Sequence, residues 1–513
     1  MVQSSRPAFC NPKRPRRASR KPPKGPVDGF FGGPRGTAGA LRGRATLCYG
    51  RGRIGGAADL PLLALRIFVV LLALALMGAA CAEVGAPQEA DATGCPEGSA
   101  AGTDGTCQCL PGVPVCGGLC RPDLAPLDLD YLADADACAT YECGATYPAA
   151  CLTLPVWQLF VEDSNLALLY ANRDADLEVP ARLLVDDLCR PARLELHGGL
   201  ARTFDKKSFQ VTLQGGGLPF DPFGDALDAA GLPVEDLILK AQWVDPSFVR
   251  DALAHELVRA AGGLAPRVRF VHLVLARHYH GLYALTEAVD GRFLQGAGLP
   301  PRGDLYKAVN HNANFQKKDN FLAGYEKKQG SEDSDAALGA LLAALWACPS
   351  GDQACFDADV LPHLDLDSYF AYLAANALAD NRDAFTKNYY LFSSSGGTPG
   401  PFFTVNWDAD ATFGLNWDGN VAQPPVLGPW GRPTGLSNRL AALPNYRALY
   451  LEMLAALSDA ALEGGLLEAR LTELEAALAP DLRFEECRWN RPGAFAQSIA
   501  LIRDFLANRP GSL

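Results

Sequence analysis

The order of hydrophobic periodicities along the chain constrains its fold more than any other feature. Between about Leu152 and Leu513, strand-like runs come first and helical periods of 3.6 residues come later, without an internal repeat. The strand-like runs are residues 192–197, 208–213, 268–275 and 282–286, and the helical periods are residues 336–346, 369–378, 446–457 and 466–478. This order predicts an α+β fold with a strand-rich N-terminal lobe followed by a helix-rich C-terminal lobe.

Residues 1–58 differ from the remainder of the chain in charge. They hold 13 of the 46 Lys and Arg residues and one acidic residue, Asp28, although the whole chain of 513 residues has a net charge of −12. The segment is rich in Pro, Gly and Arg and has no helical or strand period, which predicts a basic disordered arm. Such an arm can bind nucleic acid, but the residues that follow it indicate export, so we expect no nucleic-acid partner. A translation start downstream of Met1 is an alternative explanation of the arm.

Residues 59–81 have the pattern of an export signal. An apolar run at residues 67–80 follows Arg51 and Arg53 and ends at Cys81. It is shorter than the roughly 20 residues of a membrane span. Small residues before Cys81 resemble a lipoprotein cleavage site, although Gly78 stands where such sites usually have an aliphatic residue. We therefore expect an exported protein that contacts the membrane through a lipid anchor on Cys81.

Residues 82–151 form a cysteine-rich linker. Such cysteine density in a segment too small to bury a core predicts disulfides and an oxidising compartment. Zinc is the alternative, but the cysteine pairs lack a neighbouring histidine and the CxxC spacing of a zinc ribbon. A further pair, Cys348 and Cys355, flanks a short loop and is expected to close it. The eight cysteines of the linker are Cys95, Cys107, Cys109, Cys116, Cys120, Cys138, Cys143 and Cys151.

Two adjacent lysines at the start of the second strand-like run are candidates for a phosphate contact. Strand alternation puts Lys207 on the same face as Phe209 and Val211, whereas Lys206 shares the opposite face with Gln210. A lysine at the rim of an apolar face needs an anion, so Lys207 is preferred and Lys206 is the second choice. The structural alternative is a solvated strand end.

A helix is well marked between Pro246 and Gly262, and it carries two further candidates. A carboxylate on the helix that follows a phosphate-contacting lysine strand can pair with the lysine and hold it in place. We predict that Glu256 does this, and that Arg250 contacts phosphate. A solvated surface position is the alternative for Glu256.

The strand at residues 282–286 leads towards the second lobe and ends at Glu287. Backbone atoms around residues 286–289 are therefore expected to hold a nucleotide base, with Glu287 beside it. Further along, Lys307 or Lys327 is expected to reach the phosphates.

The candidate catalytic stretch follows the helical period at residues 369–378. Asp383 is predicted to be the catalytic base for a substrate hydroxyl, and Asn388, five residues later, to be a metal ligand. A predicted hairpin then leads to Asp408 and Asp410, whose oxygens suit magnesium. The alternative is a calcium site or a purely structural acidic turn.

Several of these segments together resemble the CotH (spore-coat protein H) kinase family. They are residues 197–213 with the Lys-Lys-Ser run, 281–287, 305–307, 325–328, 387–392, 407–414 and the closing 502–509, and the resemblance covers about residues 152–513. One departure is residues 197–202, His-Gly-Gly-Leu-Ala-Arg, where the family usually has a more polar run.

The resemblance implies an atypical protein-kinase-like fold, ATP and Mg²⁺ as cofactors, and phosphorylation of Ser or Thr in surface or coat proteins. It also implies that Asp383 is catalytic, that Asn388 and Asp408 bind metal, and that Lys206 or Lys207 contacts phosphate. Two alternatives remain open: a surface lipoprotein or adhesin that keeps the fold only for partner binding, and a pseudokinase. The sequence does not indicate an oligomeric state.

Overall fold

The computed structural model describes residues 95–510, apart from residues 104–105, 134–137, 139, 145, 187, 225–232, 331–334 and 395–399. The predicted basic arm and export signal, including Cys81, lie outside the described residues. Within the described part of the chain, no helix is both long enough and apolar enough to cross a membrane.

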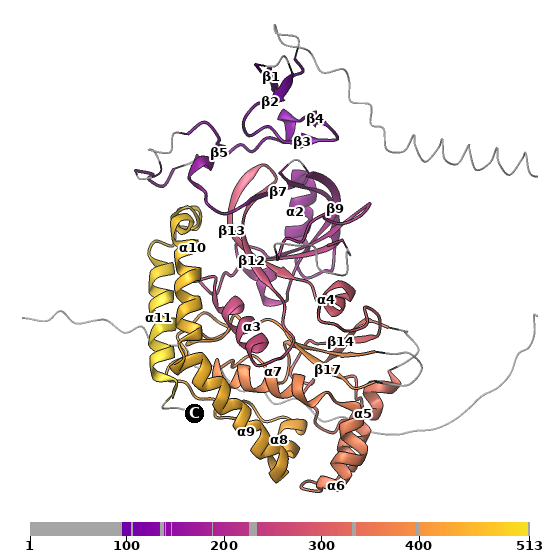
Figure 1. Ribbon diagram of the computed structural model, residues 1–513. Coiled ribbons are helices and arrows are strands. Elements are labelled where there is room, and N and C mark those ends of the chain that lie inside the picture. Colours follow the sequence, from indigo (N-terminus) through magenta and orange to yellow (C-terminus); the bar gives the residue numbers. More distant parts are fainter. Residues whose placement is uncertain are drawn as a thin grey trace, which may run out of the picture. The chain divides into compact units, whose positions relative to one another are not determined.

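Seven strands form a closed barrel in the order β10-β11-β13-β12-β7-β8-β9 (Figure 1). Neighbouring strands are antiparallel except β7 and β12, which are parallel. Alternate residues fill the barrel, among them Phe209, Val211 and Leu213 of β10. The barrel strands are β7 (Val156–Phe160), β8 (Glu178–Val185), β9 (Leu188–Leu196), β10 (Phe209–Leu213), β11 (Asp236–Lys240), β12 (Val268–Leu275) and β13 (His278–Glu287).

A second sheet of four strands, in the order β15-β14-β16-β17, lies among the helices of the C-terminal half. A shared apolar cluster packs this sheet against the barrel, with Ile238 of β11 beside Tyr390, Phe392 and Trp407. The four strands are β14 (Asp304–Ala308), β15 (Tyr325–Gln329), β16 (Tyr389–Ser393) and β17 (Phe403–Asn406).

Helix α7 (Leu366–Leu378) is the centre of the helical part. Its side chains from Ser368 to Leu378 are buried, and Asp365 caps its N-terminus by accepting a hydrogen bond from the Ser368 N–H. It packs against α3 (Arg250–Ala260), β17 and α9 (Pro444–Ser458). The other helices are α2 (Asp163–Ala171), α4 (Gly291–Gly296), α5 (Ala336–Ala347), α6 (Gln353–Cys355), α8 (Gly435–Ala442), α10 (Leu466–Trp489) and α11 (Ala494–Asn508).

Helices α10 and α11 lie side by side, and α10 packs against barrel strand β13 (Figure 1). Two buried carboxylates of α10 make the attachment. Asp481 accepts hydrogen bonds from the Thr153 and Leu154 N–H groups and lies 2.9 Å from His272 Nε2. Glu485 accepts from the Leu282 N–H and pairs with Lys206. The C-terminal helices are therefore part of the barrel's support.

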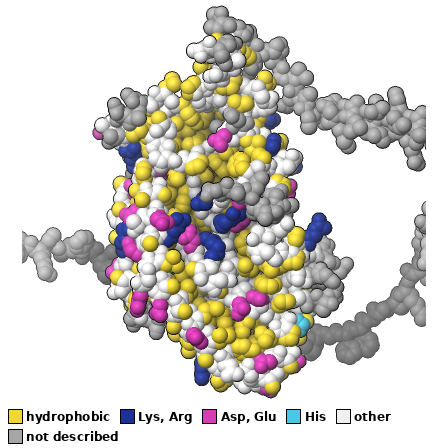
Figure 2. Space-filling view, viewed as in Figure 1, with side chains coloured by type: hydrophobic (Ala, Val, Ile, Leu, Met, Phe, Trp, Pro, Cys, Tyr) yellow, Lys and Arg dark blue, Asp and Glu magenta, His cyan; other side chains and the backbone are white. Residues whose placement is uncertain are grey.

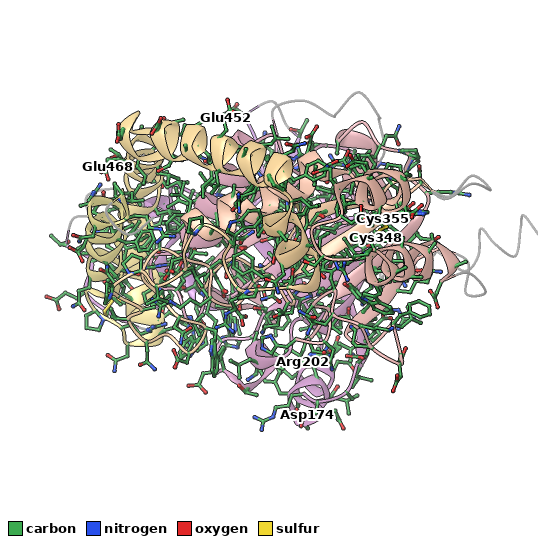
Figure 3. The ribbon with its side chains drawn as sticks, turned by 90° about the horizontal axis from the view of Figure 1, so that it is seen from below. Asp174, Arg202, Cys348, Cys355, Glu452 and Glu468 are labelled. Carbon is green, nitrogen blue, oxygen red and sulfur yellow. A yellow bond between two sulfur atoms is a disulfide. The ribbon has the colours of Figure 1, made fainter. Side chains whose placement is uncertain are left out.

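Every cysteine of the described cysteine-rich segment forms a disulfide, as predicted, and zinc is not its role. Two of the bonds attach the segment to the remainder of the protein, because Cys116 joins Cys189 of β9 and Cys143 joins Cys487 of α10. The Cys348–Cys355 bond closes its short loop as expected (Figure 3). The remaining pairs are Cys95–Cys107, Cys109–Cys120 and Cys138–Cys151.

The α+β class predicted from the sequence is confirmed. The predicted strands match parts of β9, β10, β12 and β13 to within one residue, and the predicted helices fall within α5, α7, α9 and α10. Strand β11 was not predicted, although its three apolar residues Leu237, Ile238 and Leu239 are flanked by charges. The four-stranded sheet also means that strands are not confined to the first half of the chain.

The lengths of the loops that two of the disulfides close predict how much each disulfide contributes to stability. Replacing Cys143 and Cys487 with Ser opens a loop whose ends are 344 residues apart in the sequence. Replacing Cys348 and Cys355 opens a loop whose ends are 7 residues apart. Loop-closure entropy then predicts losses in unfolding free energy of about 6 and about 2.5 kcal/mol. Guanidinium denaturation of the oxidised variants measures both values. An equal or larger loss for the Cys348/Cys355 variant would contradict the expectation.

Candidate functional site

A cavity of about 810 Å³ lies between the barrel and the second sheet. Its walls come from the loop after β9, from β10 and β11, from residues 288–290, from β14, and from the segments around β16 and β17. On the face shown in Figure 2, basic side chains gather near the middle beside acidic ones. The cavity is therefore lined by charges from segments far apart in the sequence.

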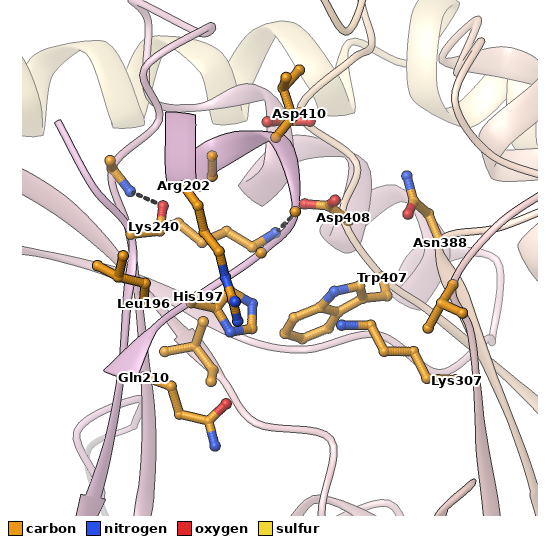
Figure 4. A pocket seen from close by; sticks show the side chains of 18 of the residues that line it. Leu196, His197, Arg202, Gln210, Lys240, Lys307, Asn388, Trp407, Asp408 and Asp410 are labelled. Carbon is orange, nitrogen blue, oxygen red and sulfur yellow. Dashed lines mark hydrogen bonds and ion pairs between the residues drawn. The ribbon is translucent and has the colours of Figure 1, made fainter. Parts of the chain in front are cut away.

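Lys240, the last residue of β11, forms two ion pairs at this cavity. Its Nζ lies 2.9 Å from Asp251 Oδ2 of α3 and 3.0 Å from Asp408 Oδ1 (Figure 4). Burial lowers the pKa of Lys240, but the charges of Asp251, Asp408 and Asp410 outweigh burial and raise the pKa above its ordinary value. Lys240 is therefore a permanent cation at the cavity wall.

Asp251 joins α3 to the loop after β17. Its Oδ1 accepts a hydrogen bond of 2.8 Å from the Ala409 N–H, between Asp408 and Asp410. Burial raises the pKa of Asp251, but Lys240 and His255 lower it further, so the net shift is well below the ordinary range. An ionised Asp251 thus positions both the lysine and the acidic loop.

A chain of polar contacts, most of them buried hydrogen bonds, runs from Asp251 to the loop that carries Asp383. At one end, His255 Nε2 lies 3.2 Å from Asp251 Oδ1, and at the other the Asp383 N–H donates to Asn381 Oδ1 at 3.1 Å. Each intermediate step is between 2.8 and 3.1 Å. The side chains along this chain are, in order, His255, Asn406, Asn376 and Asn381. The two halves of the site are therefore held in one polar network.

Asp383 and Asn388 lie together on the loop between α7 and β16. Asp383 Oδ2 accepts from Asn388 Nδ2 at 2.9 Å, and Asp383 Oδ1 pairs with Lys387 Nζ at 2.9 Å. Burial raises the pKa of Asp383, and Lys387 partly opposes the shift. Because Asn388 uses its amide N–H on Asp383, its Oδ1 is left as the acceptor of this side chain.

Asp408 and Asn388 supply the oxygens that suit a magnesium ion. Both residues line the cavity, and both have a left-handed backbone, with φ of 56° and 60°. Such conformations are costly for residues other than glycine and are concentrated at functional sites. The Asp408 side chain is 41% exposed, so a ligand can reach it. One carboxylate and one amide oxygen fit Mg²⁺, which usually takes its other ligands from water and substrate phosphates.

Asp410 also lines the cavity. Burial and the negative charge of Asp408 raise the pKa of Asp410 well above its ordinary value, despite Lys240. A cation beside the two carboxylates would relieve this repulsion. The residues present therefore fit a divalent cation.

The side of the cavity formed by the second sheet carries a second lysine among aromatic rings. Lys307 Nζ lies 5.3 Å from the Trp407 ring and 5.7 Å from the Tyr390 ring. Burial lowers the pKa of Lys307 to about 8, with Lys328 and Lys240 adding to the effect and Asp408 opposing it. His197 faces the same ring edge on, with ring centroids 6.2 Å apart (Figure 4). An anion would stabilise the charged form of Lys307, as the phosphate role predicted for it requires.

The structure separates the predicted pair Lys207 and Glu256, and this prediction is wrong. Lys207 does not line the cavity, since its Nζ donates to the Phe204 carbonyl and lies over the Tyr170 ring. Glu256 faces helix α10, where both its oxygens accept from Arg470. Strand register turns Lys207 away from the cavity, and the packing of α3 against α10 turns Glu256 away from it.

Three other predicted contacts are occupied by protein partners. Arg250 is fully buried and donates to Asp245, Ser498 and the Thr412 carbonyl, so it holds segments together and does not line the cavity.

Glu287 is bound by Arg267 and Arg292, and only the residues after it, 288–290, reach the cavity. Lys206 does line the cavity, but its Nζ is 2.6 Å from Glu485 and also donates to the Leu282 carbonyl. Neither side chain is placed as the predicted nucleotide contact requires.

Lys240 and Asp251 are the residues that the sequence analysis missed. The pairing of a strand lysine with a carboxylate on the following helix was assigned to β10, one strand before the correct strand, β11. The carboxylate is Asp251, which lies in the first turn of α3, five residues before Glu256. A signal was present, because Lys240 ends a short apolar run immediately before the well-marked helix. Strand alternation then places Lys240 on the same face as Ile238, outside the barrel and towards the second sheet.

The fold and the cavity define an α+β protein with a site of lysines, carboxylates and an amide. The chain belongs to the CotH kinase protein family, whose family model matches residues 194–513. It is 26% identical over 366 residues to inner spore coat protein H of Bacillus subtilis (strain 168), a match that covers 69% of this chain and 95% of that protein.

Among solved structures, the HipA, HipB and operator DNA complex of the Shewanella oneidensis MR-1 toxin–antitoxin system overlaps with a TM-score of 0.28 at 14% identity. The overlap covers 70% of this chain and 76% of that chain. A TM-score this low adds nothing to the assignment.

The raised pKa of Asp410 predicts a pH-dependent effect of Asp410→Asn. In the metal-free wild-type protein, protonation of Asp410 stabilises the fold, so stability falls as pH rises above the ordinary value of 3.8. Asn cannot ionise, so we expect a higher melting temperature for the variant at neutral pH and a gap that closes towards the ordinary value. Thermal unfolding with EDTA measures this.

The exposed Asp319 provides the control, since Asp319→Asn should not change the melting temperature at either pH. If Asp410→Asn is less stable than wild type at neutral pH without metal, the charged form of Asp410 does not destabilise the fold and the expectation is wrong.

Proposed function

We propose that this chain is an exported CotH-like kinase that transfers the γ-phosphoryl group of ATP to Ser or Thr hydroxyls of surface or coat proteins. The convergence of Asp383, Asn388 and Asp408 on one cavity with the Lys240–Asp251 pair is the observation that supports it most. Phosphoryl transfer needs little covalent chemistry from the protein, so a positioned base, metal ligands and cations are sufficient. The two-lobed kinase-like description of the fold is part of this proposal.

In the proposed mechanism, Asp383 accepts a hydrogen bond from the acceptor hydroxyl and orients it towards the phosphate. Lys387 and Asn388 hold the Asp383 carboxylate in place at 2.9 Å each. Lys240, fixed by Asp251, and Lys307 supply positive charge for the phosphates. Residues 288–290 form the opposite wall, where the nucleotide base would lie.

The residues that would hold Mg²⁺ are Asn388 and Asp408, with Asp410 beside them. When bound, the ion supplies charge neutralisation for the phosphate oxygens. Asp251 keeps these ligands in position through the Ala409 N–H, and it does not need to contact the ion itself.

A surface protein that keeps the fold for partner binding is the second candidate. The disulfide-bonded N-terminal segment favours it, because Leu110, Leu119, Leu127 and Leu132 are between 45% and 80% exposed there. Only the kinase would transfer phosphate, and that transfer can be measured directly.

Asp383→Ala tests the catalytic proposal. We expect the full chain to transfer radiolabelled phosphate from MgATP to itself or to a serine-rich acceptor, and the variant to lose about 10²–10⁴-fold in rate because it lacks the positioned base. Its melting temperature should match wild type. Absence of transfer and of ATP binding in a folded wild-type protein would make the partner-binding protein the better account, and binding without transfer would indicate a pseudokinase.

Lys240→Met and Lys207→Met form a matched pair for the phosphate contact. Lys240→Met should lower MgATP affinity strongly and reduce the unfolding free energy by about 3–5 kcal/mol, because it leaves the buried Asp251 carboxylate without its lysine partner. Lys207→Met should change neither quantity much. Calorimetric titration and denaturation measure them, and Lys240→Arg keeps the charge if the Met variant does not fold. Loss of affinity in Lys207→Met alone would contradict the assignment.

A further inference from the structure

Gln242 is a buried polar residue that the proposed mechanism does not use. It lines the cavity and is only 4% exposed, yet among the described residues neither its Oε1 nor its Nε2 has a hydrogen-bond partner. Its backbone is also left-handed, with a φ of 50°. A buried amide without partners costs free energy, and in native structures each such group calls for an explanation. A strained backbone at a cavity wall is consistent with a ligand contact.

The position of Gln242 separates it from the wall assigned to the nucleotide base. Strand register pairs Leu237 with Glu287, so residues 288–290 lie beside the start of β11. Gln242 follows the other end of β11, and the two ends of a five-residue strand are about 13 Å apart. A nucleotide whose base lies at residues 288–290 and whose phosphates reach Lys240 therefore leaves Gln242 beyond the phosphates.

The segment around Gln242 is held by contacts of the residues next to it in the chain. The Ala241 N–H donates to Ser208 Oγ at 3.0 Å, and Arg491 of the C-terminal region donates to the Trp243 carbonyl at 2.8 Å. Arg250 binds both Asp245 and the carbonyl of Thr412, which joins this segment to the loop after β17. The amide is therefore presented by a fixed backbone.

An exposed aromatic ring lies at the rim of the same end. Trp417 lines the cavity and is 49% exposed. Its loop touches the Gln242 segment, since a Cβ on Gly419 would lie 3.7 Å from the Val244 carbonyl oxygen. Exposed tryptophan beside a polar anchor is common where proteins bind peptides.

We propose that Gln242 binds the acceptor: its side-chain amide pairs with the backbone of one residue in an extended polypeptide that lies across Trp417 and presents its hydroxyl to Asp383. A primary amide has one acceptor oxygen and N–H donors, so it can bond together to the N–H and the C=O that one residue of an extended chain presents on the same side. The inference rests on the proposed phosphoryl transfer for its geometry and adds the binding mode of the acceptor. The alternative partner of a free glutamine amide is an adenine edge, which the position beyond Lys240 disfavours.

Peptide binding without turnover tests this inference. The probe is a fluorescein-labelled mixture of short peptides with a central serine and randomised flanks, titrated by anisotropy with the full chain and saturating MgADP. We expect Gln242→Ala to weaken binding by about tenfold, as the loss of two neutral hydrogen bonds predicts, and MgADP affinity to stay at the wild-type value. Gln242→Glu, which keeps the size but loses the donor, should also weaken binding. Gln497→Ala, at an exposed position on α11, is the matched control and should bind like wild type.

Four outcomes would overturn the inference. They are unchanged peptide affinity in both Gln242 variants, a loss of MgADP affinity instead, no binding of the peptides by wild type, and a loss of peptide affinity that Gln497→Ala shares. Failure of the proposed function is a different result, because wild type would then bind the peptides, with the Gln242 dependence intact, but transfer no phosphate to them.

Discussion

The ion triad of Lys240, Asp251 and Asp408 is the interaction on which the site depends. Its three members come from a barrel strand, from helix α3 and from the loop after β17. Removing one partner of a buried ion pair leaves the other charge uncompensated, at a cost of about 3–5 kcal/mol. The barrel, the helix and the second sheet therefore have one arrangement in which all three charges are satisfied, and that arrangement forms the cavity.

The polar chain that begins at Asp251 extends this constraint to the proposed base. Asn376 and Asn406 are buried and use their amides on one another and on neighbouring groups, so neither can be shifted without leaving a donor or acceptor unpaired. Helix α10 contacts the barrel through Glu485, and the disulfides of Cys116 and Cys143 join the N-terminal segment to β9 and to α10. The site is thus held by covalent and polar contacts that reach well beyond its lining residues.

Part of the site was predictable because it is local in sequence. Asp383 and Asn388 are five residues apart on one loop, and Asp408 and Asp410 follow one strand, so a single segment of backbone places each pair. The lysine and its acid were mispredicted for the opposite reason. Lys207 and Glu256 satisfy the same local rules as Lys240 and Asp251, and only the barrel register and the packing of α3 against α7 and α10 decide which pair faces the cavity.

The sequence by itself determined the α+β class, the main strands and helices, the candidate acidic motifs and the disulfide-bonded state of the cysteines. These follow from periodicity and short-range spacing, which backbone geometry imposes within a few residues. The tertiary structure decided which lysine meets which carboxylate, which cysteines pair, that Arg250 is a scaffold residue, and that the Gln242 amide has no partner among the described residues. Those outcomes depend on contacts between residues far apart in the chain, where strand register, burial and charge compensation select one partner among several that are locally equivalent.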